Sequence, residues 1–365
     1  MLFIEENLFS LVMALFFSFL LSFALTPLVK KLANKAGAID VPDSVRHIHD
    51  SPTERMGGLA IFIGFSFGLF LLPEFTRELR GVIYGAVLLV VCGIVDDIRP
   101  LPPLLKLLVQ IIAAIFAMSH GVVIEHLRFF SFSGGAYVMN LGIFSFLFTL
   151  LWIVGITNAL NLIDGLDGLA ASLSMVSAAT MLVIAISLCD IDVSIMLLAL
   201  IGALLGFLPY NSHPAKIFMG DTGSLFLGYI LSTVSIQGAF KLHTAITFLV
   251  PFLALALPVL DTALAFFRRL KEKQNPMHAD KKHLHHRLLD YGFNQKEAVS
   301  LMTMVSSLLG LFSLTMATEG RVRLIAIYIL YVCTSLMGFL IYNTIKTVKQ
   351  RRTDAHLEEN DDAQA

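Results

Sequence analysis

Charged residues are scarce in this sequence. Asp, Glu, Lys and Arg make up 15% of its 365 residues and 56% are hydrophobic, whereas soluble domains average about 25% charged and 45–50% apolar residues. The apolar residues also come in long blocks rather than at amphipathic spacing. This pattern excludes a soluble globular protein and predicts a chain that crosses a membrane many times.

Cysteines and glycine-rich nucleotide motifs are also nearly absent. The three cysteines (Cys92, Cys189 and Cys333) are far apart and mostly lie in apolar blocks, which excludes a disulfide framework and a cysteine zinc site. The sequence has no Walker A motif and no G-x-G-x-x-G after a strand, which excludes P-loop and Rossmann chemistry.

Basic residues are missing before the first apolar block. Glu5 and Glu6 precede that block, whereas Lys30, Lys31 and Lys35 follow it. A cleavable signal peptide has the opposite order. We therefore expect the first span to remain in the protein, with its N-terminus outside the membrane.

The apolar blocks predict an all-α, polytopic membrane helical bundle of about 11 transmembrane helices. Lys and Arg indicate its orientation, because cytoplasmic segments are enriched in them. Of the 26 in the chain, 20 fall on the predicted inner segments and 6 on the outer ones, which favours an outer N-terminus and a cytoplasmic C-terminus. The predicted spans are 8–29, 57–73, 81–95, 104–119, 141–158, 168–188, 193–209, 223–240, 244–264, 298–317 and 324–345.

These spans form one predicted transmembrane catalytic domain, residues 1–345. The charged tail that follows, residues 346–365, has the composition of a solvated, disordered cytoplasmic segment. The longest outer loop, 120–140, contains aromatic residues and glycines and is expected to pack at the membrane interface.

Four polar stretches interrupt the apolar chain, and the predicted topology places all of them on the inner face. Acidic residues at a membrane edge are costly unless they are paired or bind a metal, and they are candidates for function. Four such stretches on one side of the membrane indicate a single site. They are GIVDDIRPLPPLLK (93–106), NALNLIDGLDG (158–168), YNSHPAKIFMGDTGS (210–224) and HADKKHLHHRLLDYGF (278–293).

Asp96 and Asp97 end a span as adjacent carboxylates. A cation or a shared proton would relieve their mutual repulsion. The alternative, a solvated helix end, is less favourable because an acid at the C-terminal end of a helix opposes the helix dipole.

In the second stretch, Asn and Asp recur every three residues, at Asn158, Asn161, Asp164 and Asp167. This spacing places Asn161 and Asp164 on one face of a helix, and the glycines among them would let a phosphate or sugar approach the backbone. A polar turn is the alternative, although the stretch is very acidic for a position so near lipid.

Asp221 lies between two glycines in FMGDTGS, just before a span expected to start near Thr222 or Gly223. It suits two roles equally, as a cap for that helix and as a ligand of Mg²⁺, whose other oxygen ligands come from a diphosphate and water. Phe218 is placed either to stack on a base or to pack at the membrane interface.

The fourth stretch contains His283, His285, His286 and Arg287, next to further lysines. Three histidines can bind zinc, but no cysteine accompanies them and the neighbouring cations favour a phosphate or diphosphate clamp. A basic loop against anionic lipid headgroups is the remaining alternative. Asp261, inside a predicted span, is equally suited to function and to pairing with a buried amide.

Together these features indicate a nucleotide-diphosphate site at the cytoplasmic edge of the membrane. Carboxylates suit Mg²⁺, and a cationic loop suits phosphate. Such a site can join a water-soluble activated donor to a lipid acceptor. The residues alone therefore predict a Mg²⁺-dependent transfer to a membrane lipid.

Six motifs follow one another along the chain: MGGLAIF, DDIRPLPPLLK, TNALNLIDGLDGLA, HPAKIFMGDTGSLFLGY, DTALAFFRR and DKKHLHHRL. Together they resemble the polyprenyl-phosphate N-acetylhexosamine-1-phosphate transferases, glycosyltransferase family 4, over about residues 20 to 300. The histidine motif is more similar to the bacterial branch that uses undecaprenyl phosphate and UDP-N-acetylglucosamine than to the muramyl-pentapeptide branch.

This resemblance implies a reaction at the cytoplasmic face of the bacterial inner membrane. The phosphate of undecaprenyl phosphate attacks the β-phosphorus of UDP-N-acetylglucosamine, releases UMP and leaves undecaprenyl-diphospho-N-acetylglucosamine. This would be the first membrane step of a cell-envelope polysaccharide of the O-antigen, enterobacterial common antigen or teichoic acid type. A lipid phosphate is already mostly anionic at neutral pH, which favours direct attack over a covalent aspartyl intermediate.

The resemblance also implies a Mg²⁺ cofactor, with Mn²⁺ able to substitute, a homodimer by analogy, and no nucleic acid partner. It implies the following residue roles. Asp221 and Asn161 are metal ligands, Asp164 lies beside the metal, and Asp96 and Asp97 bind or deprotonate the acceptor phosphate. Phe218 stacks on uracil, and Asp167, Leu162 and Asn211 line the nucleoside pocket. Lys106 contacts phosphate, and His283, His285, His286 and Arg287 grip the sugar and diphosphate.

Some alternatives stay open. The muramyl branch has a lysine shortly before MGG, where this chain has Asp50 and Arg55, so a role for Arg55 is undecided. The donor is alternatively UDP-N-acetylgalactosamine or a muramyl pentapeptide. A secondary transporter is the alternative from another class, and it predicts acids near the middle of the spans rather than at their inner ends.

Overall fold

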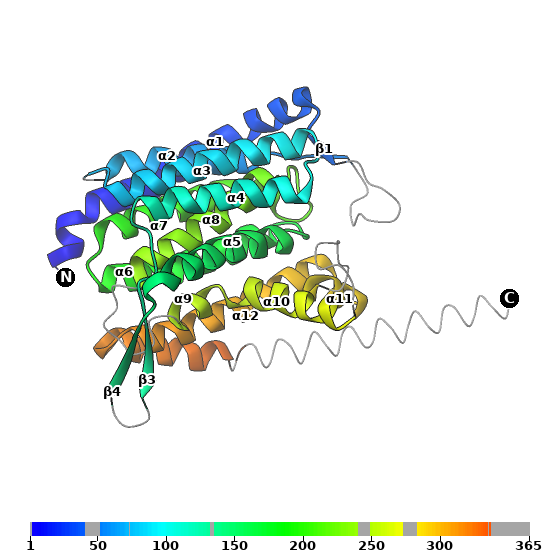
Figure 1. The fold of residues 1–365 in the computed structure, drawn as a ribbon. Helices are drawn as coiled ribbons and strands as arrows, with labels where there is room; N and C mark the ends of the chain where they lie inside the picture. The colour runs from blue at the N-terminus through cyan, green and yellow to red at the C-terminus, as the bar shows by residue number, and fades with distance from the viewer. Residues whose placement is uncertain are drawn as a thin grey trace.

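The computed structural model describes residues 2–40, 52–72, 74–131, 135–239, 249–272, 283–334 and 336. Its helices lie side by side in one bundle (Figure 1). They are α1 (Leu2–Ala36), α2 (Gly58–Gly68), α3 (Arg77–Ile98), α4 (Pro103–Ser119), α5 (Ser145–Ile163), α6 (Leu169–Ser187), α7 (Ile191–Asn211), α8 (Gly220–Ala239), α9 (Leu249–Ala254), α10 (Ala256–Lys271), α11 (Leu284–Asp290) and α12 (Gln295–Ala317). Residues 320–334 are also helical, and the predicted tail, 346–365, lies outside the described residues.

The protein is a polytopic membrane helical protein. Six of its described helical segments are long and apolar enough to cross a membrane: Phe3–Ala36, Arg77–Ile98, Gly142–Ile163, Leu169–Ser187, Ile191–Asn211 and Gln295–Ala317. Two shorter apolar helices, Gly58–Leu71 and Pro103–Ser119, pack among them. The apolar blocks of the sequence therefore predicted where helices form.

Several helices differ from the predicted spans. Helix α1, Leu2–Ala36, extends beyond the predicted 8–29 at both ends. The span predicted for 141–158 is helix α5, which continues to Ile163, because Asn158 and Asn161 find hydrogen-bond partners on neighbouring helices. The span predicted for 244–264 is interrupted: α9 ends at Ala254 and α10 begins at Ala256, and residues 240–248 lie outside the described part.

The outer loop contains a β-hairpin that the sequence analysis did not predict. Strands β3 (His126–Ser131) and β4 (Gly135–Asn140) pair antiparallel, with Arg128 opposite Val138, and the hairpin projects from the bundle (Figure 1). A second short pair, β1 (Ile39–Asp40) and β2 (Thr53–Glu54), lies near the end of α1.

Helix α8 forms the centre of the bundle. It packs against α3 and α5, and residues 225–236 are almost completely buried. Its first turn approaches two other helices very closely, because Gly58 of α2 and Gly93 of α3 lie against the backbone of Thr222 and Gly223. A side chain at either glycine would overlap that backbone, so small residues fix the crossing.

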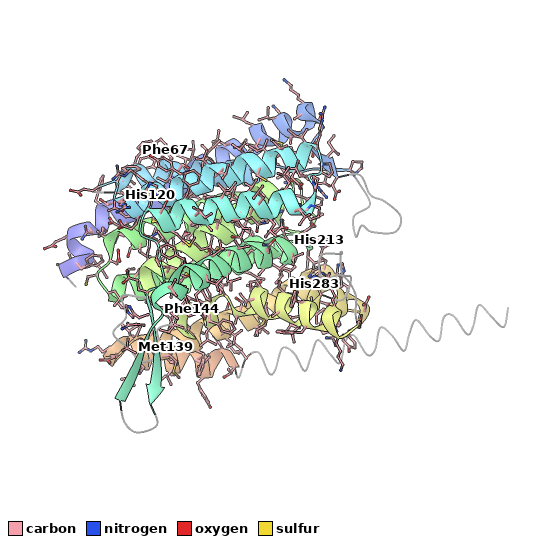
Figure 2. The ribbon with its side chains drawn as sticks, in the orientation of Figure 1. Phe67, His120, Met139, Phe144, His213 and His283 are labelled. Carbon is pink, nitrogen blue, oxygen red and sulfur yellow. The ribbon has the colours of Figure 1, made fainter. Side chains whose placement is uncertain are left out.

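The two ends of the bundle differ in chemistry. His213 and His283, from two of the polar stretches, lie at one end, and His120, Met139 and Phe144 lie at the opposite end (Figure 2). The polar stretches of the sequence thus meet at a single end of the helices, as the predicted topology requires.

Candidate active site

A cavity of about 260 Å³ lies at this polar end of the bundle. Its walls come from the end of α5, the first turn of α8, the end of α7, α11, and the β1–β2 region. Seven residues proposed for the site from sequence line it: Asn161, Asp164, Asp167, Asn211, Phe218, Asp221 and His286. Segments more than a hundred positions apart in the chain therefore converge here.

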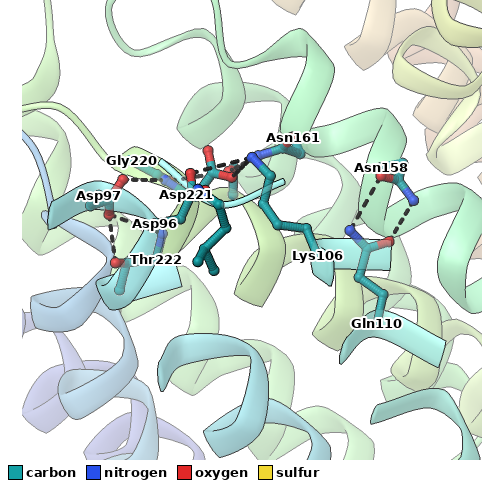
Figure 3. Close-up of polar contacts among 11 residues, drawn as sticks. Asp96, Asp97, Lys106, Gln110, Asn158, Asn161, Gly220, Asp221 and Thr222 are labelled. Atoms are coloured by element: carbon teal, nitrogen blue, oxygen red, sulfur yellow. Dashed lines mark hydrogen bonds and ion pairs between the residues drawn. The ribbon is translucent and has the colours of Figure 1, made fainter. Parts of the chain in front are cut away.

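Asp97 holds the first turn of α8 in place. Its carboxylate accepts hydrogen bonds from the backbone N–H of Asp221 (2.9 Å), the backbone N–H of Thr222 (3.2 Å) and the Thr222 hydroxyl (2.6 Å). Figure 3 shows this cluster. Gly220 has φ +71°, and a side chain there would overlap the Asp97 carboxylate. The result is that Asp97 positions Asp221 at the cavity wall.

Lys106 joins Asp96 to Asp221. Its ammonium group lies 3.3 Å from Asp96 Oδ2 and 2.9 Å from Asp221 Oδ2 (Figure 3). Asp96 also accepts a hydrogen bond from the backbone of Leu101, which is 2.8 Å away. One half-buried cation is thus shared by two carboxylates from different helices, next to the cavity.

Asn161, Asp164 and Asp221 line the same cavity. The Asn161 amide nitrogen donates to the Ser224 hydroxyl at 2.9 Å. Burial and the neighbouring carboxylates of Asp221 and Asp97 raise the pKa of Asp164 to about 7. A cation in the cavity would favour its ionised form and release the proton.

Asn158 belongs to the structure rather than to the cavity. It exchanges two hydrogen bonds with Gln110 of α4 (Figure 3), and it also donates to the backbone of Val154. This pairing satisfies both amides inside an apolar bundle. Asn158, the first of the four Asn and Asp residues that recur every three positions, is therefore a structural residue.

One side of the cavity offers a rigid wall with an available acceptor. The Asn211 amide donates to the Ile217 carbonyl at 3.1 Å, and its buried Oδ1 has no hydrogen-bond partner among the described residues. Phe218 is held by two backbone bonds, from its N–H to Glu54 and from Gly57 to its carbonyl. Asp167 accepts from the His213 ring and the Ala215 N–H and holds the loop after α7.

A buried pair anchors the histidine segment. His283 Nδ1 lies 2.9 Å from Asp261 Oδ2, and the Leu284 N–H donates to Asp261 Oδ1 at 2.8 Å. Asp261 thereby fixes the start of α11, so the residue that the sequence left undecided has a clear partner. The His285 and His286 rings follow, with their centroids 4.3 Å apart, and His286 reaches the cavity.

The structure does not bring every predicted residue to the cavity. Leu162 is 43% exposed and points away from it, because it lies on another face of α5. Arg287 is exposed, and His283 and His285 are buried behind the wall. Burial lowers the pKa of His285 to about 3, so this ring is neutral and packs on Gly165 rather than forming a cationic clamp.

Asp40 and Arg55 line the cavity although the sequence assigned neither a role there. Arg55 Nη2 lies 2.7 Å from Asp40 Oδ1, and the pairing of β1 with β2 brings the two together. The signal in the sequence was the position of Arg55 directly before MGG. Its distance to the other polar stretches could be judged only in the fold.

The residues present fit Mg²⁺ but do not form a complete cage. Among the described residues, no group of three His, Cys, Asp or Glu side chains is arranged to hold a metal ion alone. Mg²⁺ commonly takes one or two carboxylates and completes its shell with substrate phosphates and water. Asp221, Asp164 and the Asn161 carbonyl oxygen supply that type of partial site.

Several known proteins are similar to this chain in sequence. The family model described as "Glycosyl transferase family 4" matches residues 79–239. The chain is 38% identical, over 92% of its length and 93% of the relative, to the Bacillus subtilis (strain 168) protein named "Probable undecaprenyl-phosphate N-acetylglucosaminyl 1-phosphate transferase".

Two further relatives come from other bacteria. The decaprenyl-phosphate N-acetylglucosaminephosphotransferase of Mycolicibacterium smegmatis is 36% identical over 78% of this chain and 76% of its own length. The undecaprenyl-phosphate alpha-N-acetylglucosaminyl 1-phosphate transferase of Escherichia coli K12 is 27% identical over 77% of each chain.

Proposed function

Because the chain belongs to glycosyl transferase family 4, we propose that it transfers N-acetylglucosamine-1-phosphate from UDP-N-acetylglucosamine to undecaprenyl phosphate. The products are undecaprenyl-diphospho-N-acetylglucosamine and UMP. The observation that carries this proposal is the convergence of Asp164, Asp221 and Phe218 around one cavity at the polar end of the bundle, with Lys106 in contact with Asp221.

The cavity suits a uridine diphosphate donor. The Phe218 ring would offer a surface for the uracil, and the Asn211 Oδ1, which has no partner among the described residues, would accept the uracil N3–H. The diphosphate then lies toward Asp221 and Lys106, and the sugar toward His286 of α11. Arg55 is a further cation that lines the cavity.

The charges at the cavity require a cation when the diphosphate binds. Asp221, Asp164 and Asn161 would hold Mg²⁺ together with donor phosphate oxygens, and Mn²⁺ would occupy the same ligands. When bound, the metal neutralises the diphosphate and the UMP leaving group. Lys106, which two carboxylates share in the structure, is then available to contact phosphate.

The acceptor approaches from the membrane. An apolar groove of about 290 Å³ runs between α5 and α10, lined by Trp152, Ile156, Ala159, Phe266 and Phe267. Ala159 is less than two helical turns along α5 from Asp164, which lines the cavity, so a polyprenyl chain in this groove would bring its phosphate toward the polar end of the bundle. A lipid phosphate oxygen is already anionic near neutral pH and attacks the β-phosphorus directly.

Asp96 and Asp97 take different parts in this scheme. Asp97 already accepts three hydrogen bonds from the start of α8 and serves to hold Asp221 in position. Asp96 and its partner Lys106 are the pair that meets the acceptor phosphate. The proposed topology, with about 11 spans and a cytoplasmic C-terminus, gives the site access to cytoplasmic UDP-N-acetylglucosamine.

A transfer assay tests the proposal. Membranes containing the protein, undecaprenyl phosphate and UDP-[¹⁴C]N-acetylglucosamine should move label into the lipid phase with Mg²⁺ and lose this transfer when EDTA is added. UDP-N-acetylgalactosamine and UDP-muramyl-pentapeptide serve as competing donors. Label that stays in water, transfer that is unchanged by EDTA, or preference for another donor would contradict the proposal.

A further inference from the structure

A second cavity, of about 580 Å³, lies beside the C-terminal end of α1. Thr26, Pro27 and the following turns of α1 form one wall, and the end of α7 with Ile217 forms the other. No residue lines both this cavity and the candidate active site. We call it the α1–α7 cavity.

The α1–α7 cavity is strongly basic. Four lysines line it (Lys30, Lys31, Lys35 and Lys216) against one acid, Glu54, so its lining carries a formal net charge of +3. Glu54 is already engaged: it lies 3.4 Å from Lys30 and accepts a hydrogen bond from Asn34 at 3.2 Å. The other three lysines have no ion-pair partner among the described residues.

An aromatic path leads from this cavity along the surface of α1. The Phe23 ring lies 5.3 Å from the ring of Tyr210, which lines the cavity, and 5.9 Å from the stacked ring of Phe19. Phe19 and Phe23 are 36% and 40% exposed. In a membrane-spanning helix these exposed rings face acyl chains, so the cavity is continuous with the lipid-facing surface of the protein.

We propose that the α1–α7 cavity binds the phosphate headgroup of an anionic phospholipid, whose acyl chain lies along Phe19 and Phe23. The lysines supply the charge complementarity for an anionic headgroup. Pro27 and Ile217 in the lining, together with the aromatic path, favour an occupant with both a charged and an apolar part. If these lysines served only to orient the protein by the positive-inside rule, neither the apolar lining nor the aromatic path would be needed beside them. The proposal is independent of the transfer reaction.

Binding of phosphatidylglycerol to the purified full-length protein tests this inference. Native mass spectrometry in a neutral detergent should show one phosphatidylglycerol retained per chain and weaker retention of phosphatidylcholine. The double variant Lys31→Gln/Lys216→Gln should bind phosphatidylglycerol roughly tenfold or more weakly, since each lysine near an anionic headgroup adds to the free energy of binding. Transfer activity in phosphatidylcholine nanodiscs checks that the variant is folded.

The matched control is Lys271→Gln/Lys296→Gln, which removes the same charge from exposed positions outside the cavity. It should retain phosphatidylglycerol as the native chain does. Equal losses in both double variants, no loss in either, or equal retention of phosphatidylcholine would overturn the proposal. So would displacement of the lipid by millimolar inorganic phosphate, or by equimolar undecaprenyl phosphate, since the site would then belong to a free anion or to the acceptor.

Discussion

Replacing Asp221 with Asn should lower turnover by at least about a hundredfold while the protein remains folded. The substitution removes the charge that faces the donor diphosphate, and even the outer partners of a metal site commonly change activity 10–100-fold. Asn keeps a carbonyl oxygen for the hydrogen bond from Lys106, which lies 2.9 Å from Asp221, and the Asp97 bonds go to backbone and Thr222 groups. The measurement is the transfer assay on purified protein, with melting temperature as the check on folding.

The matched control is Asp190→Asn, at the start of α7. Asp190 accepts a hydrogen bond from the Val193 N–H, and Asn caps helices about as well as Asp does. This variant should therefore keep normal turnover. Near-normal activity in Asp221→Asn would show that Asp221 is not a metal ligand. Its role would then be structural only, in the first turn of α8.

A second large effect is expected from Gly58→Ala. An added Cβ on α2 would lie 2.0 Å from the backbone nitrogen of Gly223, so α2 and α8 must separate. We expect the free energy of unfolding to fall by about 2–3 kcal/mol, as for overpacked cores. Activity should fall by more than the amount of folded protein does, because Asp221 lies only two positions before Gly223. Thermal melting and the transfer assay on the same sample measure both effects.

Gly238→Ala is the control for this prediction. It makes the same change within α8, but the nearest atom to the added Cβ is 3.4 Å away, at Val193. Alanine favours a helix over glycine by about 1 kcal/mol, so this variant should be neutral or slightly stabilised. If Gly58→Ala behaves in the same way, the close crossing of α2 and α8 does not set the geometry of the site.

The sequence predicted the helices and the composition of the site well, because both depend on local signals. Apolar blocks give membrane helices whatever their partners. The acidic and amide residues stand out against an apolar background, so Asp164 and Asp221 could be selected without a structure. That they meet at one end followed from the positive-inside rule applied to the four stretches.

The direction of individual side chains could not be predicted. Asn158 and Asn161 are three residues apart, yet one pairs with Gln110 of α4 and the other faces the cavity. Leu162 follows Asn161 directly and points outward. These differences depend on how α5 is rotated against α4 and α8, and the rotation is set by close contacts that no single segment encodes.

The roles of Asp97 and Asp261 could not be predicted, because they depend on contacts between residues that are distant in the sequence. The sequence treated Asp96 and Asp97 as an equivalent pair, but in the structure only Asp97 caps α8. Asp261 was undecided because its partner His283 is 22 positions away. The carboxylates lie at the ends of α3, α5 and α8 rather than near the helix midpoints, which also argues against the transporter alternative.

Binding of Mn²⁺ in the presence of UDP-N-acetylglucosamine tests most directly whether these distant segments hold a divalent cation against the donor diphosphate. Electron paramagnetic resonance of free Mn²⁺, titrated into the purified protein with the donor, should show one tightly bound ion per chain. The same titration with Asp221→Asn should show no such ion, while Asp190→Asn binds as the native chain does. An Asp221→Asn protein that binds Mn²⁺ as tightly as the native chain would contradict the account.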